Sequence, residues 1–177
     1  MPRFKAGQQI LTALCLLLGS AVGFAQPPGW SALLEPEQLA QILDIHNSDR
    51  PDQPVRILRV TGDYAAGHIP GAVSAPYAQF RGPQDNAGQL PAIGSLQTLV
   101  QHLGIDAATP VVVVHQGNSA ADMGAATRVY WTLKSLGVQH LAVLDGGFQR
   151  WQSANLPIST TSVTVTPTTF LPQWQDT

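Results

Sequence analysis

Short apolar runs alternate with longer amphipathic stretches along the middle of the chain. Three of the runs are mainly aliphatic and bounded by turn-forming residues, which is typical of strands buried on both faces: residues 55–60, 110–114 and 141–144. Apolar residues recur at three- and four-residue spacing over 93–103 and 126–136, and Gly104 and Gly137 follow these stretches. The pattern predicts two helices, each ending at a glycine.

Two further helices are expected on either side of this region. Residues 36–43 begin with a proline, which suits the first turn of a helix, and their apolar side chains share one face. Trp151 belongs to a short last helix that follows a turn at 145–147. Strands that alternate with helices indicate βαβ units. We therefore predict an α/β fold, a three-layer domain with a central, mainly parallel sheet and helices on both faces.

Composition supports a single folded domain. The chain has 177 residues, of which 44% are hydrophobic and 11% charged, with 16 Gly and 14 Pro. Such a chain is too apolar to be disordered and too rich in turn formers to be a helical bundle. Its nine Lys and Arg residues are scattered rather than clustered, so we expect no nucleic-acid partner.

The first 25 residues have the pattern of a secretory signal peptide. Arg3 and Lys5 precede an apolar run over 10–18, and small residues occupy positions 23 and 25, where a signal peptidase reads the chain. The run is shorter than the roughly 20 residues of a membrane-spanning helix, which favours cleavage after Ala25 over an uncleaved anchor. We therefore expect a periplasmic or secreted protein with no membrane attachment after cleavage.

The single cysteine, Cys15, lies inside this predicted signal. The mature chain would then hold no thiol, which excludes disulfides, cysteine metal sites and a thiolate nucleophile within it. His46, His102 and His140 show no metal-ligand spacing to one another. We expect neither a metal nor another cofactor.

Candidate chemistry lies in the loop after 111–114, because ligands of open α/β sheets bind beyond the carboxyl ends of the strands. Glycines and small polar residues lead here into a helix, whose first N–H groups can hold an anion. The candidate ligand-binding residues are His115, Gln116, Gly117, Asn118, Ser119 and, on the helix, Arg128. The alternative is an ordinary surface loop with Ser119 or Asp122 as the helix N-cap.

Three motifs together resemble a rhodanese-like (thiosulfate sulfurtransferase) domain. Gly-His-Ile-Pro-Gly-Ala at 67–72, Arg-Val-Tyr-Trp at 128–131 and Leu-Asp-Gly-Gly-Phe at 144–148 occur in the order of that family, and the match runs from about Leu39 to Pro157. The resemblance implies a small α/β domain with a parallel sheet. It also implies a cysteine directly after the middle strand, which accepts sulfane sulfur as a persulfide and passes it to a thiophilic acceptor.

The chain departs from this family in three ways. His115 stands at the position of the cysteine, and imidazole cannot carry a persulfide. Arg59-Val60-Thr61 stands where an Asp-Val-Arg pattern is usual, and the loop before Arg128 is longer than that of catalytic single-domain members. The longer loop, with the Arg-Val-Tyr-Trp helix, resembles the non-catalytic N-terminal half of tandem-domain sulfurtransferases.

This resemblance implies a chain that is inactive by itself, with no catalytic residue of its own. Its partner would be a catalytic rhodanese domain of a thiosulfate or 3-mercaptopyruvate sulfurtransferase, in the same polypeptide or as a separate chain. The alternative is a stand-alone domain that binds or senses a small sulfur-containing anion through the loop. For His115 itself, a ligand contact, general-base chemistry and a neutral placeholder all stay open.

Structural roles are expected for the other motif residues, which are Gly67, His68, Pro70, Gly71, Asp145, Gly146 and Gly147. His68 is expected to fix the turn before Pro70 through hydrogen bonds to the backbone, and Asp145 to order the two glycines that follow it. Arg128 either contacts a bound oxyanion or forms an ion pair with Asp145 or Asp122, and we favour the ion pair.

The domain limits follow from these assignments. Residues 1–25 form the signal, 26–36 an N-terminal segment, 37–157 the rhodanese-like domain and 158–177 a Thr- and Pro-rich tail. An edge strand, an extended arm and an interdomain linker are the three interpretations of the tail. Its prolines and the lack of a following segment favour the last two.

Overall fold

The strands form one parallel sheet in the order β1-β5-β4-β2-β3. This computed structural model describes residues 26–49 and 54–175. The strands are β1 (Leu33–Leu34), β2 (Arg56–Arg59), β3 (Val73–Ser74), β4 (Val111–Val114) and β5 (Leu141–Leu144). The three predicted strands are thus present at the centre of the sheet, with β4 in the middle. The outer strands β1 and β3 were not predicted, because two residues are too few to show a periodic pattern.

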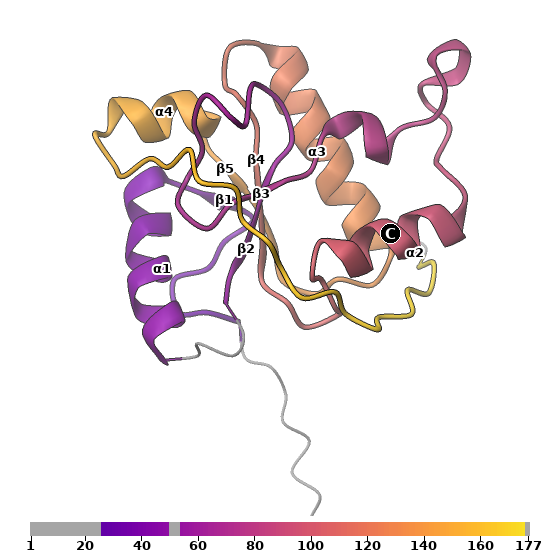
Figure 1. Cartoon of the computed structure of the whole chain (residues 1–177), viewed down its shortest axis with the longest axis horizontal. Coiled ribbons are helices and arrows are strands. Elements are labelled where there is room, and N and C mark those ends of the chain that lie inside the picture. Colours follow the sequence, from indigo (N-terminus) through magenta and orange to yellow (C-terminus); the bar gives the residue numbers. More distant parts are fainter. Residues whose placement is uncertain (1–25, 50–53, 176–177) are drawn as a thin grey trace, which may run out of the picture.

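Helices cover both faces of the sheet. They are α1 (Pro36–Asp49), α2 (Ile93–His102), α3 (Ala120–Ser135) and α4 (Gly147–Ser153), with two short 3-10 turns, η1 (Tyr77–Phe80) and η2 (Gln84–Asn86). In Figure 1, α1 and α4 lie on one side of the sheet and α2 and α3 on the other. The predicted three-layer α/β fold is confirmed.

The valines of β4 explain why the sheet is buried on both faces. All four are fully buried. Val111 and Val113 pack with the side chains of α2 and α3, whereas Val112 and Val114 pack with those of α1 and α4. Successive side chains of a strand point to opposite faces, so a continuous apolar run is what a strand between two helical layers requires.

Two helices are longer than their apolar patterns predicted. α1 continues from the predicted end at residue 43 to Asp49, and α3 begins at Ala120 rather than near residue 126. The added residues include exposed polar and small side chains, which extend a helix without adding to its apolar face.

The tail lies along the domain as an extended segment, drawn in yellow in Figure 1. His68 and Ser159 form an isolated antiparallel bridge, and the N–H of Gln175 donates to the carbonyl of Ser135 at 2.8 Å. Val163, Val165 and Phe170 pack against the core on the α2 and α3 side. The predicted signal at 1–25 lies outside the described residues. None of the helices within the described ranges is long and apolar enough to cross a membrane.

Candidate functional site

His115 directly follows β4, at the carboxyl end of the central strand. Its side chain is only 3% exposed. Both ring nitrogens are buried, and neither forms a hydrogen bond of regular geometry with a described residue, although the backbone of Leu144 interacts with the ring. Such weak pairing is unusual for a buried imidazole, because buried polar atoms are nearly always hydrogen-bonded.

The turn between β5 and α4 closes over His115. The N–H of Phe148 donates to the carbonyl of His115 at 2.8 Å, and the N–H of Gln149 donates to that of Gln116 at 2.9 Å. At Gly147, which has φ +63°, a Cβ atom would lie 2.5 Å from the carbonyl oxygen of His115 and 2.8 Å from its Nδ1. Only glycine fits this contact. A Cβ atom on Gly117 would likewise overlap the carbonyl oxygen of Gly146.

Asp145 begins this turn and forms an ion pair with Arg150 on α4. Arg150 also pairs with Glu35 at 2.6 Å. These side chains are partly exposed, so each pair adds at most about 1 kcal/mol. The pairs join the start of α4 to the end of β1.

Arg59 and Thr61 hold the loop from beneath. The Arg59 side chain is 3% exposed, donates to the side-chain oxygen of Gln116 and lies 4.4 Å from the centre of the Phe148 ring. The hydroxyl of Thr61 accepts the backbone N–H of Gln116 at 2.8 Å. The residues at which the sequence departs from the family's Asp-Val-Arg pattern therefore support the loop through Gln116.

The N-terminus of α3 is already occupied by groups of this chain. Ser119 is the N-cap, and its hydroxyl accepts the N–H of Asp122 at 3.3 Å. The carboxylate of Asp122 accepts the N–H of Asn118 at 3.0 Å. Ser119, and not Asp122, is thus the N-cap of α3, whereas anion binding by the loop stays a prediction. Asp122 places a negative charge at the positive end of the helix, where a bound anion would otherwise lie.

Burial governs the charge states around His115. It lowers the pKa of His115 below its usual value; the Asp122 carboxylate opposes this effect and the Arg59 cation adds to it. Burial acts to raise the pKa of Asp122, but hydrogen bonds from Thr61 and from the Asn118 N–H lower it overall. Burial also lowers the pKa of Arg59 to about 10, against the charges of Asp122 and Asp63. At neutral pH the site therefore holds a neutral imidazole, a carboxylate and a guanidinium.

Arg128 makes its contacts outside this cluster. Its guanidinium donates to the carbonyl of Gly88 at 2.8 Å and lies 5.0 Å from the centre of the Trp131 ring. It forms no ion pair with any residue that the structure describes. The expected pair with Asp145 or Asp122 is therefore wrong. Asp122 lies six residues earlier on α3, which puts the two side chains on different sides of the helix, and Asp145 pairs with Arg150.

His68 is fully buried and fixes the turn that contains it. Its two ring nitrogens face the carbonyl oxygens of Tyr64 at 2.9 Å and Thr161 at 3.1 Å, and its ring stacks on that of Tyr64. The predicted hydrogen bonding of His68 to the backbone is confirmed. Sequence reasoning missed Tyr64 and the tail as its partners; a tyrosine four residues before the histidine was the only available signal.

The turn between β5 and α4 thus closes the carboxyl end of β4 over His115. It brings together His115, Gln116 and Gly117, with Asn118 and Ser119 at the helix start, and leaves Arg128 outside. No cysteine occurs within residues 26–49 and 54–175. No three His, Cys, Asp or Glu residues of these ranges gather where they could hold a metal ion. His115 lines neither the cavity between β2 and the tail nor the one between α1 and Trp151.

Comparisons with known proteins agree with this geometry. The family model "Rhodanese-like domain" matches residues 31–154. The chain is 30% identical over 165 residues to 3-mercaptopyruvate sulfurtransferase of Rattus norvegicus, covering 84% of this chain and 52% of that protein. It is 29% identical over 120 residues to the enzyme of that name from Escherichia coli K12, covering 66% and 39%.

Solved structures show the same fold. The crystal structure of SseA from Escherichia coli, described as a 3-mercaptopyruvate sulfotransferase with the rhodanese fold, superposes with a TM-score of 0.66 at 21% identity, covering 82% of this chain and 56% of that one. The chain spans about half the length of the first curated relatives that it matches, 49% and 52%.

Proposed function

Since the chain belongs to the rhodanese-like domain family of the sulfurtransferases, we propose that it is the non-catalytic partner of a catalytic rhodanese-like domain. The partner lies in the same polypeptide or in a separate chain. The observation that carries this proposal is the buried, neutral His115 at the end of β4, where the family resemblance puts the sulfur-carrying cysteine. Sulfane sulfur is carried as a persulfide on a thiolate, which imidazole cannot replace.

The surroundings of His115 support the same proposal. The backbone N–H of Asn118 is occupied by the Asp122 carboxylate, and that negative charge lies in the first turn of α3, which disfavours a second anion there. Thiosulfate and mercaptopyruvate are anions, and the ionised Asp122 repels them from this loop. The relatives are about twice as long as this chain, which leaves room for a catalytic half in proteins of this kind.

A sulfurtransferase assay on the purified chain tests the proposal. With thiosulfate and cyanide, or with mercaptopyruvate and a thiol, we expect no turnover above buffer. Robust turnover without added protein would refute it. Identifying what the gene encodes beyond Thr177, or next to it, then shows whether a catalytic partner with a short cysteine loop exists.

Replacing His115 with cysteine tests the role of the loop. The new thiolate would lie beside the Asp122 carboxylate, without free loop amides around it, so H115C should reach less than a tenth of the turnover of a catalytic rhodanese-like domain assayed alongside. The matched control is H115S, which has a similar side-chain size and no thiol. Turnover of H115C within tenfold of the catalytic domain would contradict this account of the loop.

Binding of a small sulfur oxyanion by the loop is a second candidate function. It is favoured by one observation, the two ring nitrogens of His115 without a hydrogen bond of regular geometry. Titration with thiosulfate, sulfite and sulfate tests this binding, with the heat measured by calorimetry and the ring signals of His115 by NMR. Absence of both heat and a ring shift would end this candidate.

Export is proposed from the sequence pattern of the first 25 residues. The N-terminal sequence of the protein recovered outside the cytoplasm should begin at Gln26. Recovery of the uncleaved chain in the cytoplasm alone would contradict export.

A further inference from the structure

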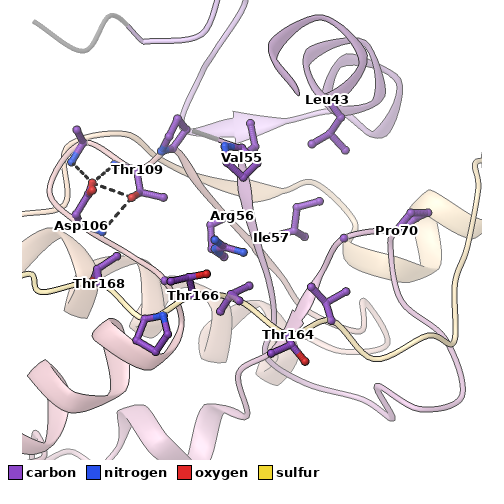
Figure 2. A pocket seen from close by; sticks show the side chains of 18 residues that line it. Leu43, Val55, Arg56, Ile57, Pro70, Asp106, Thr109, Thr164, Thr166 and Thr168 are labelled. Carbon is purple, nitrogen blue, oxygen red and sulfur yellow. Dashed lines mark hydrogen bonds between the residues drawn. The ribbon is translucent and has the colours of Figure 1, made fainter. Parts of the chain in front are cut away.

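A cavity of about 570 Å³ lies at the amino ends of the central strands, whereas His115 lies at their carboxyl ends. Its walls come from the amino end of β2, the segment before β4 and residues 163–168 of the tail. Figure 2 shows Arg56 projecting into the space between β2 and the tail, with Thr164, Thr166 and Thr168 on the far side. The strands are parallel, so the amino ends at this cavity and the carboxyl ends at His115 belong to separate sites.

Arg56 is the polar group of this cavity that has no partner. It is the first residue of β2 and is partly buried. Its Nε atom is buried without a hydrogen bond, and its guanidinium forms neither a hydrogen bond nor an ion pair with any described residue. Burial lowers the pKa of Arg56, although arginine stays protonated at neutral pH. A partly buried cation with an unpaired Nε can gain a hydrogen-bond partner, and so the structure leaves an interaction unmade here.

The neighbouring residues make room for the guanidinium but do not neutralise it. At Gly104 a Cβ atom would lie 2.9 Å from a terminal nitrogen of Arg56. The one carboxylate in the lining, that of Asp106, is used locally: it accepts the N–H groups of Ala108 and Thr109 and the hydroxyl of Thr109, at 2.8 to 2.9 Å (Figure 2). Asp106 therefore shapes the loop before β4 instead of pairing with Arg56.

The remaining walls suit an apolar body. Val163, Val165, Pro110 and Pro167 line the cavity, and Arg56 is the single cation among its lining residues. A polyphosphate would need several cations, and Asp106 makes the field less favourable still for a multiply charged anion. The planar fork of a guanidinium, by contrast, matches the two oxygens of a carboxylate.

We propose that this cavity binds a small organic carboxylate, with its carboxylate on Arg56 and its apolar part against the valine and proline side chains of the tail. Binding of a carboxylate in this cavity does not depend on the role proposed for His115. Since residues 163–168 form one wall, an occupant also fastens the tail to the domain.

Titration of the ¹⁵N-labelled full chain with benzoate tests the proposal. The Nε–H signal of Arg56 reports directly on the proposed contact. We expect a saturable shift with a Kd on the order of 1 mM, as for a small ligand held by one ion pair and some apolar contact. Benzamide, which has the same ring without the charge, should leave the signal in place, and His115 signals should not move with either compound.

Two variants separate the contact from a general effect of charge. R56Q should abolish the benzoate response, whereas the matched control K134Q, which removes an exposed cation from α3, should retain it. If R56Q does not fold, R56K keeps the charge but loses the fork, and should bind benzoate at least tenfold more weakly.

Three results would overturn the proposal. They are no shift of the Arg56 signal with benzoate, an equal shift with benzamide, and an equal shift with inorganic phosphate, since the last would mean that charge alone decides binding. None of them bears on the assay of sulfur transfer, so the two proposals fail separately.

Discussion

At His115, burial favours an imidazole that stays neutral. The ring is packed against Gly147, and burial lowers its pKa although the nearby carboxylates of Asp122 and Asp145 act to raise it. A neutral histidine of this kind keeps the loop in place without a charged or nucleophilic group. The residue therefore fills the end of the central strand with a neutral side chain, which is consistent with the proposed non-catalytic role.

The pH dependence of stability should reveal this neutral state. The lowered pKa of folded His115 means that the unfolded chain, with a histidine pKa of about 6.5, takes up the proton more readily. The contribution of His115 to stability is complete above about pH 6.5 and is lost as the pH falls toward the lower folded pKa, by at most about 1.4 kcal/mol per pH unit. Denaturant unfolding at about pH 7.5 and about pH 5.5 should show a larger loss for the wild type than for H115Q. Equal losses would show that the folded state does not disfavour the charged ring.

Gly147 is a residue at which a single methyl group should clearly lower stability. G147A places a Cβ atom 2.5 Å from the His115 carbonyl oxygen, in a left-handed backbone conformation. We expect a loss of about 2–4 kcal/mol in the free energy of unfolding. The matched control is G71A, because Gly71 has φ +82° but no atom within 4 Å of its Cβ position. It should lose only about 1 kcal/mol from backbone strain. A G147A variant as stable as G71A would contradict the packing described here.

Among the elements, α3 begins where it does because of the contacts in its first turn. Ser119 caps the helix, and the carboxylate of Asp122 in the first turn binds the N–H of Asn118, so the loop and the helix stabilise one another. The sequence predicted a helix only from residue 126, where the apolar spacing becomes regular. Residues 120–125 are kept in the helix by the N-cap and by the charge of Asp122. Neither effect requires regularly spaced apolar residues, so the apolar pattern does not show it.

Removing the cap should lower stability by about 1 kcal/mol in S119A. A control in the same helix, G124A, should change stability in the opposite direction by about 0.5–1 kcal/mol, because Gly124 has ordinary helical φ and open space at its Cβ position. Urea unfolding of both variants measures the difference. A neutral S119A would show that Asp122 alone holds the helix start.

On the scale of the whole molecule, the tail is part of the folded domain. Its valines and Phe170 pack on the core, and the edge of Trp174 meets Trp131 at 5.8 Å between ring centres. In the same segment, the carbonyl oxygen of Thr161 lies 3.1 Å from Nε2 of His68. Residues 163–168 form a wall of the Arg56 cavity.

Ending the chain after Pro157 should therefore cost stability. The lost apolar contacts amount to more than about 2 kcal/mol, since several partly buried side chains return to water. Thermal unfolding of the shortened chain should give a clearly lower Tm, whereas W174A alone should change it little because Trp174 is 44% exposed. If shortening left the Tm unchanged, the tail would not be attached to the domain in solution.

Sequence by itself determined the layered fold and the shape of the motif turns. Continuous apolar runs require burial on both faces, and two glycines after Asp145 permit a close turn, so each follows from neighbours along the chain. Tertiary structure alone decided that Arg59 lies under Gln116, that Arg128 reaches the carbonyl of Gly88 and that Arg56 faces a cavity. These contacts join residues far apart in the chain or depend on which face of an element a side chain occupies. They are set by how the elements pack, which no local pattern contains.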